Sequence, residues 1–387
     1  MMSELRIGIA GLSGRGLHWI RLIQRLKGYR ITALCDLRQE ALDDGLAAVD
    51  GEDEQACFRD YEEFLNFDGM DAVALVVRSE YQGALAAQAL EAGKHVSAEV
   101  PAAHSLDECW RIVLAQERSG KVYHLAEQCR YAGYLDKWQE LVRGGDLGDV
   151  TYAEGQYLHY YTRCMFQDPH SGELFGVDRL PEFPDAVAAW VNRMPPIHYV
   201  VHDLSPLLRV LDDRVVEVIG MSTDSPSRSH PEILSPDMQV ALMKTEKGAM
   251  LRLAASFAQP HPENDTHWQQ VIGTKGCVEW RRALDDAPRL WLADGEARDK
   301  QPQTWGFSKD QEPEEAKGSG HWNLDFYVHA AFRDAVLYDQ PLEFDVYKAM
   351  DVAAPSILAA DSIDQDSRKL DVPDFRPNAN RKKGEAP

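Results

Sequence analysis

The first 125 residues alternate short apolar runs with longer amphipathic segments. Strand-like runs such as LRIGIAG, YRITALCD and DAVALVV are followed by helix-like stretches such as GLHWIRLIQRLKG and YQGALAAQALEAG. Short apolar runs that alternate with helical patterns are typical of βαβ units, whose strands pair in parallel. The sequence therefore predicts an α/β fold with a doubly wound parallel sheet at its N-terminal end.

From Val150 onward the runs are longer, and apolar and polar residues alternate within them. Examples are VTYAEGQYLHYYT, VVEVIGMST and MQVALMKTEKGAMLRLAASF. This alternation predicts antiparallel strands with one solvated face, and the EKG and TKG turns predict hairpins. Helical periodicity returns from Asp325 to about Asp364. We therefore expect a C-terminal α+β part with a mainly antiparallel open sheet and helices.

The length of 387 residues favours two domains. We place the first over residues 1–127 and the second over residues 128–373. The stretch 295–320, rich in Gln, Glu, Lys and Pro, predicts a long surface loop, and the polar residues 374–387 predict a disordered tail.

The overall charge limits the class of partner. The chain carries 63 acidic and 41 basic residues, a formal charge of −22, so nucleic acid and anionic membranes are not expected partners. No window has the ~20 apolar residues that a membrane helix requires. The six cysteines form no C-x-x-C pair, and MMSELRIGIAG contains no export signal. These features predict a cytoplasmic protein with reduced thiols.

A glycine-rich turn follows the strand-like run LRIGI and opens the first helical segment. Its residues are Gly11, Ser13, Gly14, Arg15 and Gly16. In a dinucleotide-binding Rossmann turn, glycines allow a tight bend, close approach of the backbone to a pyrophosphate, and close helix packing. Ser13 stands at the middle position, where glycine is usual, and an ordinary strand-to-helix turn remains the alternative.

Asp36 lies about twenty residues beyond this turn, at the end of the next strand-like run, which is the spacing of a ribose-binding carboxylate. A carboxylate there repels a 2′-phosphate, so the sequence favours NAD over NADP. Arg38, two residues further on, keeps NADP open as the cofactor. The alternative role for Asp36 is that of a helix N-cap.

Glu99, Val100 and Pro101 follow the strand-like run KHVSA. Together with AGLSGRG, Asp36 and the order of predicted elements, this segment resembles the Gfo/Idh/MocA oxidoreductase family across most of the chain. That family usually has Glu-Lys-Pro, with lysine as a catalytic or substrate-orienting group. Val100 replaces the lysine and has no proton to donate. We assign Glu99 and Pro101, the latter with a cis bond, to the cofactor site; a purely structural role is the alternative.

Further fragments resemble the NAD-dependent glycosidase branch of that family, typified by α-N-acetylgalactosaminidases. EQCRY at 127–131 is similar to its Glu-Asn-Cys-x-Tyr, and AEGQYLH at 153–159 to its Ala-Glu-Gly-x-Tyr-x-His. YVVHDLSP at 199–206 is similar to Tyr-Pro-Thr-His-Gly-Leu-Gly-Pro, with Asp203 and Ser205 in place of the two glycines. These departures bear on the identity of the sugar more than on the chemistry.

The resemblance implies glycoside hydrolysis without net redox change. A tightly held NAD⁺ oxidises a sugar carbon, commonly C3, the C2 proton is removed, the C1 group departs, water adds, and the hydride returns. By its motif His202 exchanges protons with the substrate, and Tyr199 is the relay or the C2 base. For His202 the alternative is a structural residue at the start of the helix DLSPLLRVLDD.

Other residues are candidates for binding the sugar or the cofactor by their positions and chemistry. Tyr157 and His159 share one face of a predicted strand and would line the sugar site, with a surface aromatic strip as the alternative. Glu127 is assigned to the cofactor site, with a structural role as the alternative. His198, Arg130 and Arg163 are candidate substrate residues. Arg130, Arg163 and Arg193 are candidates for recognising an anionic substituent, with ordinary surface arginines as the alternative.

Two other functional classes remain open. One is an NAD-dependent sugar or cyclitol dehydrogenase that releases NADH, and the other is a cofactor-binding regulatory protein without catalysis. A metal is not expected, because His159, His198 and His202 lack the helix spacing that joins ligands. By resemblance we expect a carbohydrate or glycoside as the substrate and a homo-oligomer formed through the C-terminal sheet.

Overall fold

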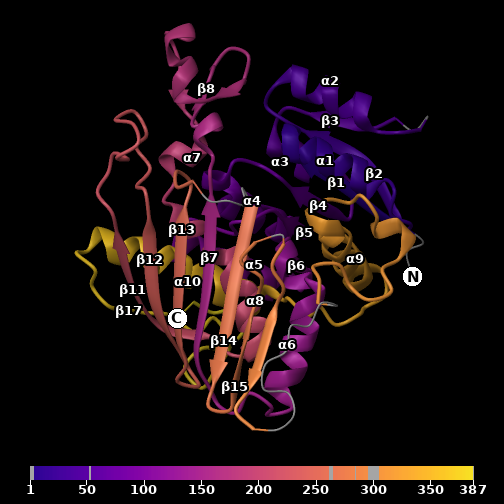
Figure 1. Cartoon of the computed structure of the whole chain (residues 1–387). Coiled ribbons are helices and arrows are strands. Elements are labelled where there is room, and N and C mark those ends of the chain that lie inside the picture. The colour runs from indigo at the N-terminus through magenta and orange to yellow at the C-terminus, as the bar shows by residue number, and fades with distance from the viewer. Residues whose placement is uncertain (1–3, 52–53, 261–264, 284, 295–304, 387) are drawn as a thin grey trace. The chain divides into compact units, whose positions relative to one another are not determined.

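The computed structural model describes residues 4–51, 54–260, 265–283, 285–294 and 305–386. These residues form two compact units. Unit 1 contains the residues through Tyr131, Ser308–Ala353 and the residues from Asp374 onward, and unit 2 contains Ala132–Phe307 and Ala354–Pro373. Figure 1 gives the labels of the elements.

The core of unit 1 is a parallel sheet of six strands in the order β3-β2-β1-β4-β5-β6. This is the strand order of a dinucleotide-binding doubly wound sheet, so the predicted N-terminal fold class is confirmed. The strands are β1 (Leu5–Ala10), β2 (Tyr29–Cys35), β3 (Ala56–Phe58), β4 (Ala72–Leu75), β5 (His95–Ala98) and β6 (Tyr123–Leu125). The helices between them are α1 (Gly14–Ile23), α2 (Gln39–Ala48), α3 (Tyr61–Leu65), α4 (Ser79–Glu91) and α5 (Leu106–Ser119), and the 3-10 turn η1 (Gln128–Tyr131) follows β6.

Unit 1 also includes a helix far along the chain. In α9 (Leu324–Leu337), Phe326, Val328 and Phe332 are buried in the same apolar cluster as Ile7 of β1 and Trp19 of α1. The predicted boundary at residue 127 therefore differs from the observed units, because the apolar face of α9 completes the core of the parallel sheet. The predicted loop 295–320 lies partly outside the described residues, and its later part contains η5 (Glu314–Ala316), followed by η6 (His321–Asn323).

The predicted tail is described as far as residue 386 and makes contacts within unit 1. The Arg381 guanidinium donates to both oxygens of Glu117 on α5, at 2.8 and 2.9 Å, and the two side chains are 3% and 0% exposed. The polar composition of this segment predicts disorder. Its contact with Glu117 could not be read from the sequence, because the two residues are 264 positions apart in the chain.

Unit 2 is built on an open sheet of eight strands in the order β16-β15-β14-β7-β13-β12-β11-β17. All neighbouring pairs are antiparallel except β7 and β13, which are parallel, so the predicted mainly antiparallel sheet is confirmed. The strands are β7 (Val150–His159), β11 (Val215–Ser222), β12 (Gln239–Thr245), β13 (Met250–Ser256), β14 (Asp265–Gly273), β15 (Gly276–Glu279), β16 (Arg289–Leu292) and β17 (Leu370–Asp371). The predicted hairpin turns join β12 to β13 and β14 to β15.

The helices of unit 2 begin with α6 (Gly133–Arg143). α8 (Val201–Leu211) lies against β7 and β14, as seen behind the sheet in Figure 1. α10 (Val346–Asp364) contributes its first half to unit 1 and its second half to unit 2. The segment between β7 and α8 contains η2 (Thr162–Cys164), β8 (Phe166–Gln167), β9 (Leu174–Phe175), η3 (Val177–Glu182), β10 (Val187–Ala188), α7 (Trp190–Arg193) and η4 (Pro196–Val200). None of the helices in the described ranges combines the length and apolar character needed to cross a lipid bilayer.

Candidate functional site

The glycine-rich turn forms a close backbone cradle in unit 1. Gly11 has φ +88°, and a Cβ at this position would collide with the Val76 carbonyl group. A Cβ at Gly16 would collide with the Gly11 carbonyl, whereas a Cβ at Gly14 would meet no described atom within 4 Å. Gly11 and Gly16 therefore fit the bend and close-packing positions of a dinucleotide turn, and Gly14 leaves space beside the start of α1. Ser13 has extended backbone geometry at the N-cap of α1.

Asp36 is held beside this turn by backbone groups. The Leu12 N–H donates to its Oδ2 at 2.9 Å, and the Arg38 N–H donates to its Oδ1 at 3.0 Å. The Arg38 Nε lies 4.0 Å from the same carboxylate. Arg38 occupies the N-cap position of α2, so Asp36 is not the helix cap that was its alternative role. The carboxylate at the end of β2 fits a ribose-binding position.

Arg15 connects the glycine turn to two distant carboxylates. Its Nε donates to Glu99 Oε2 at 2.6 Å, and its Nη1 donates to Asp325 Oδ2 at 2.7 Å. Asp325 also contacts His18 and His321. Burial opposes the charged form of Asp325, but these histidines and Arg15 hold the pKa of the carboxyl well below its usual range. Sequence reasoning missed Asp325, because its partner on α1 lies 310 residues away.

The segment that contains Glu99 is anchored by a buried amide. The Gln82 Nε2 donates to the Glu99 and Pro101 carbonyl groups, the second at 2.8 Å. The Val100–Pro101 peptide bond is cis, as expected from the sequence, and the Val100 side chain is buried. This turn gives Glu99 a fixed position from which it pairs with Arg15.

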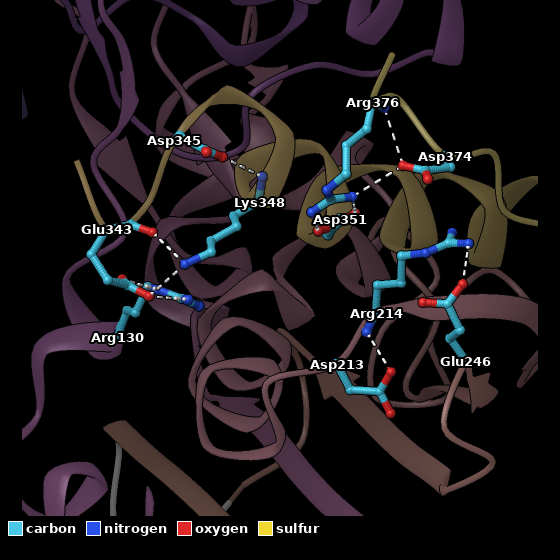
Figure 2. A network of polar contacts seen from close by, with 10 residues as sticks. All are labelled: Arg130, Asp213, Arg214, Glu246, Glu343, Asp345, Lys348, Asp351, Asp374 and Arg376. Atoms are coloured by element: carbon cyan, nitrogen blue, oxygen red, sulfur yellow. Dashed lines mark hydrogen bonds and ion pairs between the residues drawn. The ribbon is translucent and has the colours of Figure 1, made fainter. Parts of the chain in front are cut away.

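Arg130 and Glu127 are both buried at the end of β6 in unit 1. Figure 2 shows the Arg130 guanidinium against Glu343, which it meets at 2.8 and 2.9 Å; Lys348 contacts the same carboxylate at 3.1 Å. Burial opposes ionisation of Glu343, but Arg130 lowers its pKa to about 2. This ion pair favours a structural role for Arg130 over recognition of a substrate. Glu127 Oε1 accepts the Cys129 N–H at 2.8 Å.

Four residues assigned from the sequence meet in unit 2. The ring of Tyr157 lies 3.9 Å from His159, 5.3 Å from His202 and 5.7 Å from Tyr199, measured between ring centroids. Tyr199 and His202 are 5.8 Å apart. Tyr157, His159 and His202 are at most 5% exposed. The structure therefore brings two phenols and two imidazoles into one cluster, in which three of the side chains are buried and Tyr199 is half-buried.

The cluster follows from how three elements are built. Alternation along β7 puts Tyr157 and His159 on the same face. η4 continues directly into α8, so Tyr199 and His202 lie one turn apart. A Cβ at Gly155 of β7 would meet the Cβ of Asp203 at 2.7 Å, which means that the glycine lets α8 lie close to the strand.

Sequence reasoning missed a third imidazole, His267 of β14. His267 pairs directly with Tyr157 in the β7–β14 register, and its ring lies 5.3 Å from Tyr157, 5.5 Å from His159 and 5.8 Å from His202. Its Nδ1 is 3.4 Å from Oδ2 of the fully buried Asp203. The sequence carries one indication of this residue: His267 and Gln269 are polar and lie two positions apart in the run HWQQV, so they share one face of the predicted strand.

The two remaining candidates have different environments. His198 is buried in η4, one residue before Tyr199. Arg163 is exposed in η2.

Comparison with known families covers both parts of the chain. Residues 5–127 match the oxidoreductase family with an NAD-binding Rossmann fold (GFO_IDH_MocA), and residues 137–381 match the C-terminal domain of glycosyl hydrolase 109. The chain belongs to glycosyl hydrolase family 109. The resemblance to a glycosidase branch of the Gfo/Idh/MocA proteins is thereby confirmed.

Relatives of family 109 match nearly the whole chain. A family 109 protein of Saccharopolyspora erythraea is 26% identical over 96% of this chain and 83% of its own length. An α-N-acetylgalactosaminidase of Bacteroides fragilis is 24% identical, with 98% and 93% covered. The scyllo-inositol dehydrogenase of Lactobacillus casei, solved with NAD(H) and scyllo-inositol, has the same fold, with a TM-score of 0.68 at 17% identity over 95% of this chain and 99% of that chain.

Proposed function

We propose that this chain is an NAD-dependent glycoside hydrolase that oxidises its sugar transiently and finishes without net redox change. The observation that carries the proposal is the cluster of Tyr157, His159, Tyr199 and His202 in a family 109 C-terminal domain. Such a cluster supplies several groups that exchange protons with a carbohydrate. It is joined in the chain to an NAD-binding Rossmann domain.

The residues of unit 1 fit NAD as the cofactor. Gly11 and Gly16 allow the tight bend and the close packing of a dinucleotide turn, and the N-terminus of α1 would favour the negative charge of a pyrophosphate. Asp36 would bind the ribose hydroxyls and disfavour a 2′-phosphate. When bound, NAD supplies a hydride acceptor that later returns the hydride.

The residues of unit 2 would move the protons. His202 would take the proton of the hydroxyl group as the sugar carbon is oxidised, and would return it at the end. Tyr199 would remove the proton at C2, whose acidity rises when the neighbouring carbon becomes a ketone. Tyr157 and His159 would stack against the sugar ring or form hydrogen bonds with it, and would hold the sugar in place for both proton transfers.

The test follows two products from the same incubation. Para-nitrophenyl glycosides of several sugars, including α-N-acetylgalactosamine because of the Bacteroides relative, are mixed with the protein and NAD⁺. Nitrophenol release without accumulation of NADH is the expected result. His202→Ala should lower kcat by about 10²-fold or more, the usual contribution of an acid or base. His170→Ala, at an exposed histidine of unit 2, is the matched control and should leave kcat unchanged.

The same experiment separates the second candidate. The shared fold with scyllo-inositol dehydrogenase favours a sugar or cyclitol dehydrogenase as the alternative function. Stoichiometric NADH from free sugars or cyclitols, with no nitrophenol from any glycoside, would replace the glycosidase proposal by this one. A folded His202→Ala variant with the same turnover as the wild type would refute the assignment of His202.

A further inference from the structure

Asp203 is a carboxylate with 0% exposure, next to His202 on α8. Its position follows from Gly155, where only a glycine leaves room for the Asp203 Cβ. A buried carboxylate is costly unless donors surround it. Two side chains of β14 supply them: the Gln269 amide at 2.9 Å from Oδ1 and the His267 ring at 3.4 Å from Oδ2.

These contacts fix where the protons lie. The amide nitrogen of Gln269 faces Asp203, and the Tyr134 hydroxyl donates to the amide oxygen, Oε1, at 2.7 Å. The reverse orientation would put the amide oxygen against the carboxylate, which has no proton to offer. Asp203 is therefore an acceptor at both oxygens, and His267 Nδ1 must carry the hydrogen of their bond.

His267 Nε2 is consequently the ring nitrogen that would exchange a proton with a substrate. A carboxylate bonded to Nδ1–H fixes the tautomer, holds the ring orientation and stabilises the imidazolium form. The ring belongs to the cluster proposed for the sugar, since its centroid is 5.3 Å from Tyr157 and 5.8 Å from His202.

We propose that His267 is the general acid that protonates the departing glycosidic oxygen, and that Asp203 is its positioning residue. The inference rests on the proposed glycosidase function and adds a residue to it. In this step a base takes the C2 proton, the C2–H electron pair forms the C1–C2 double bond, and the C1–O pair leaves with the oxygen. The imidazolium of His267 gives its Nε2 proton to that oxygen and becomes neutral. It then takes a proton from the water that adds at C1.

Dependence on the leaving group tests this role. A dinitrophenolate departs without protonation, whereas a phenolate of ordinary basicity needs an acid. Dinitrophenyl and phenyl glycosides of the same sugar are therefore compared, using the sugar with the highest turnover in the para-nitrophenyl panel. The variants are His267→Gln and Asp203→Asn, with His170→Ala as the exposed control, and thermal unfolding is recorded for each.

We expect His267→Gln to lose about 10²-fold or more in kcat/KM on the phenyl glycoside and less than about threefold on the dinitrophenyl glycoside. Asp203→Asn, which preserves side-chain size but reverses the preferred tautomer, should show the same selective loss. The control should match the wild type on both.

Three results would overturn the inference. Equal losses on both glycosides in folded variants would mean that His267 only supports the structure of the site. Full activity on both would mean that another group is the acid. Failure of the wild type to release either phenol would overturn the proposed function itself, which the first two results would leave standing.

Discussion

At the scale of single residues, Asp36 is positioned by two backbone N–H groups rather than by a charged side chain alone. The Leu12 bond ties the carboxylate to the glycine turn, so the ribose-binding group and the pyrophosphate cradle are parts of one local structure. This arrangement gives a prediction for cofactor preference.

Asp36→Ser removes the charge and shortens the side chain. Bonds to a charged group contribute about 1.5 to 3 kcal/mol, so the Kd for NAD⁺ should rise about tenfold or more. The preference for NAD⁺ over NADP⁺ should narrow, because the repulsion of a 2′-phosphate is removed. Calorimetric titration with both dinucleotides measures this, and Asp43→Ser on the exposed face of α2 is the control. An unchanged ratio of the two affinities would contradict the assignment.

The residues of the imidazole cluster divide into those that sequence motifs indicated and those that only the sheet register supplies. Tyr157, His159, Tyr199 and His202 lie within short fragments. Spacing along a strand and along a helical turn grouped them as two pairs, and the family resemblance assigned both pairs to the sugar. His267 enters because β14 pairs with β7, and Tyr157 and His267 are 110 residues apart in the chain. No local pattern specifies which strand pairs with which across such a distance.

At the scale of elements, α8 approaches β7 closely at one point. Gly155 lies under Asp203, and Leu253 of β13 fills the other side, at 3.1 Å from a hypothetical Gly155 Cβ. A helix and a strand held this closely transmit small displacements directly to the side chains that they carry.

Gly155→Ala should therefore disturb both stability and the cluster. Overpacking of this kind costs about 1 to 3 kcal/mol, and the unfolding midpoint should fall accordingly. Glycosidase turnover should also decrease, because α8 carries His202 and Asp203. Gly14→Ala, where an added Cβ meets no described atom within 4 Å, is the matched control, with stability measured without dinucleotide. Equal stability of the two variants would show that α8 can move away from the added Cβ at position 155 without a loss of free energy of unfolding.

The strands and helices were largely readable from the sequence because their apolar periodicity is strong. The parallel pairing of β7 with β13 was not, since alternation gives the face of a strand but not its direction relative to neighbours. The short elements β8, β9 and β10 were missed because two residues carry no period. The assignment of α9 to unit 1 could not be predicted for a related reason. Its sequence is that of an ordinary amphipathic helix, and only its packing shows to which unit it belongs.

At the scale of the whole molecule, residues beyond Asp374 are part of the fold through Arg381. Burial opposes ionisation of Glu117, but bonds from Arg381, the Gly384 N–H and Tyr347 lower its pKa to about 2. A carboxyl with a pKa below its unfolded value of about 4.3 stabilises the folded state above that value, and this contribution disappears as the pH falls toward about 2.

Arg381→Ala should reduce the free energy of unfolding by about 3 to 5 kcal/mol at neutral pH, because it leaves Glu117 buried without its cation. The difference between wild type and variant should shrink as the pH is lowered from about 5 toward 2, where Glu117 becomes protonated. Urea unfolding at several pH values provides the measurement, with Lys383→Ala at a neighbouring exposed cation as the control. A constant difference across this range would rule out the ion pair as its source.

The chain passes from one unit to the other after Tyr131, Phe307, Ala353 and Pro373. During translation, the first strand of unit 1 therefore leaves the ribosome long before α9 and Arg381 exist. The parallel sheet must wait for α9, partly uncovered, while residues 132–307 of unit 2 are synthesised. Slow or paused synthesis should consequently expose nascent chains to aggregation and chaperone capture at the unit that was begun first.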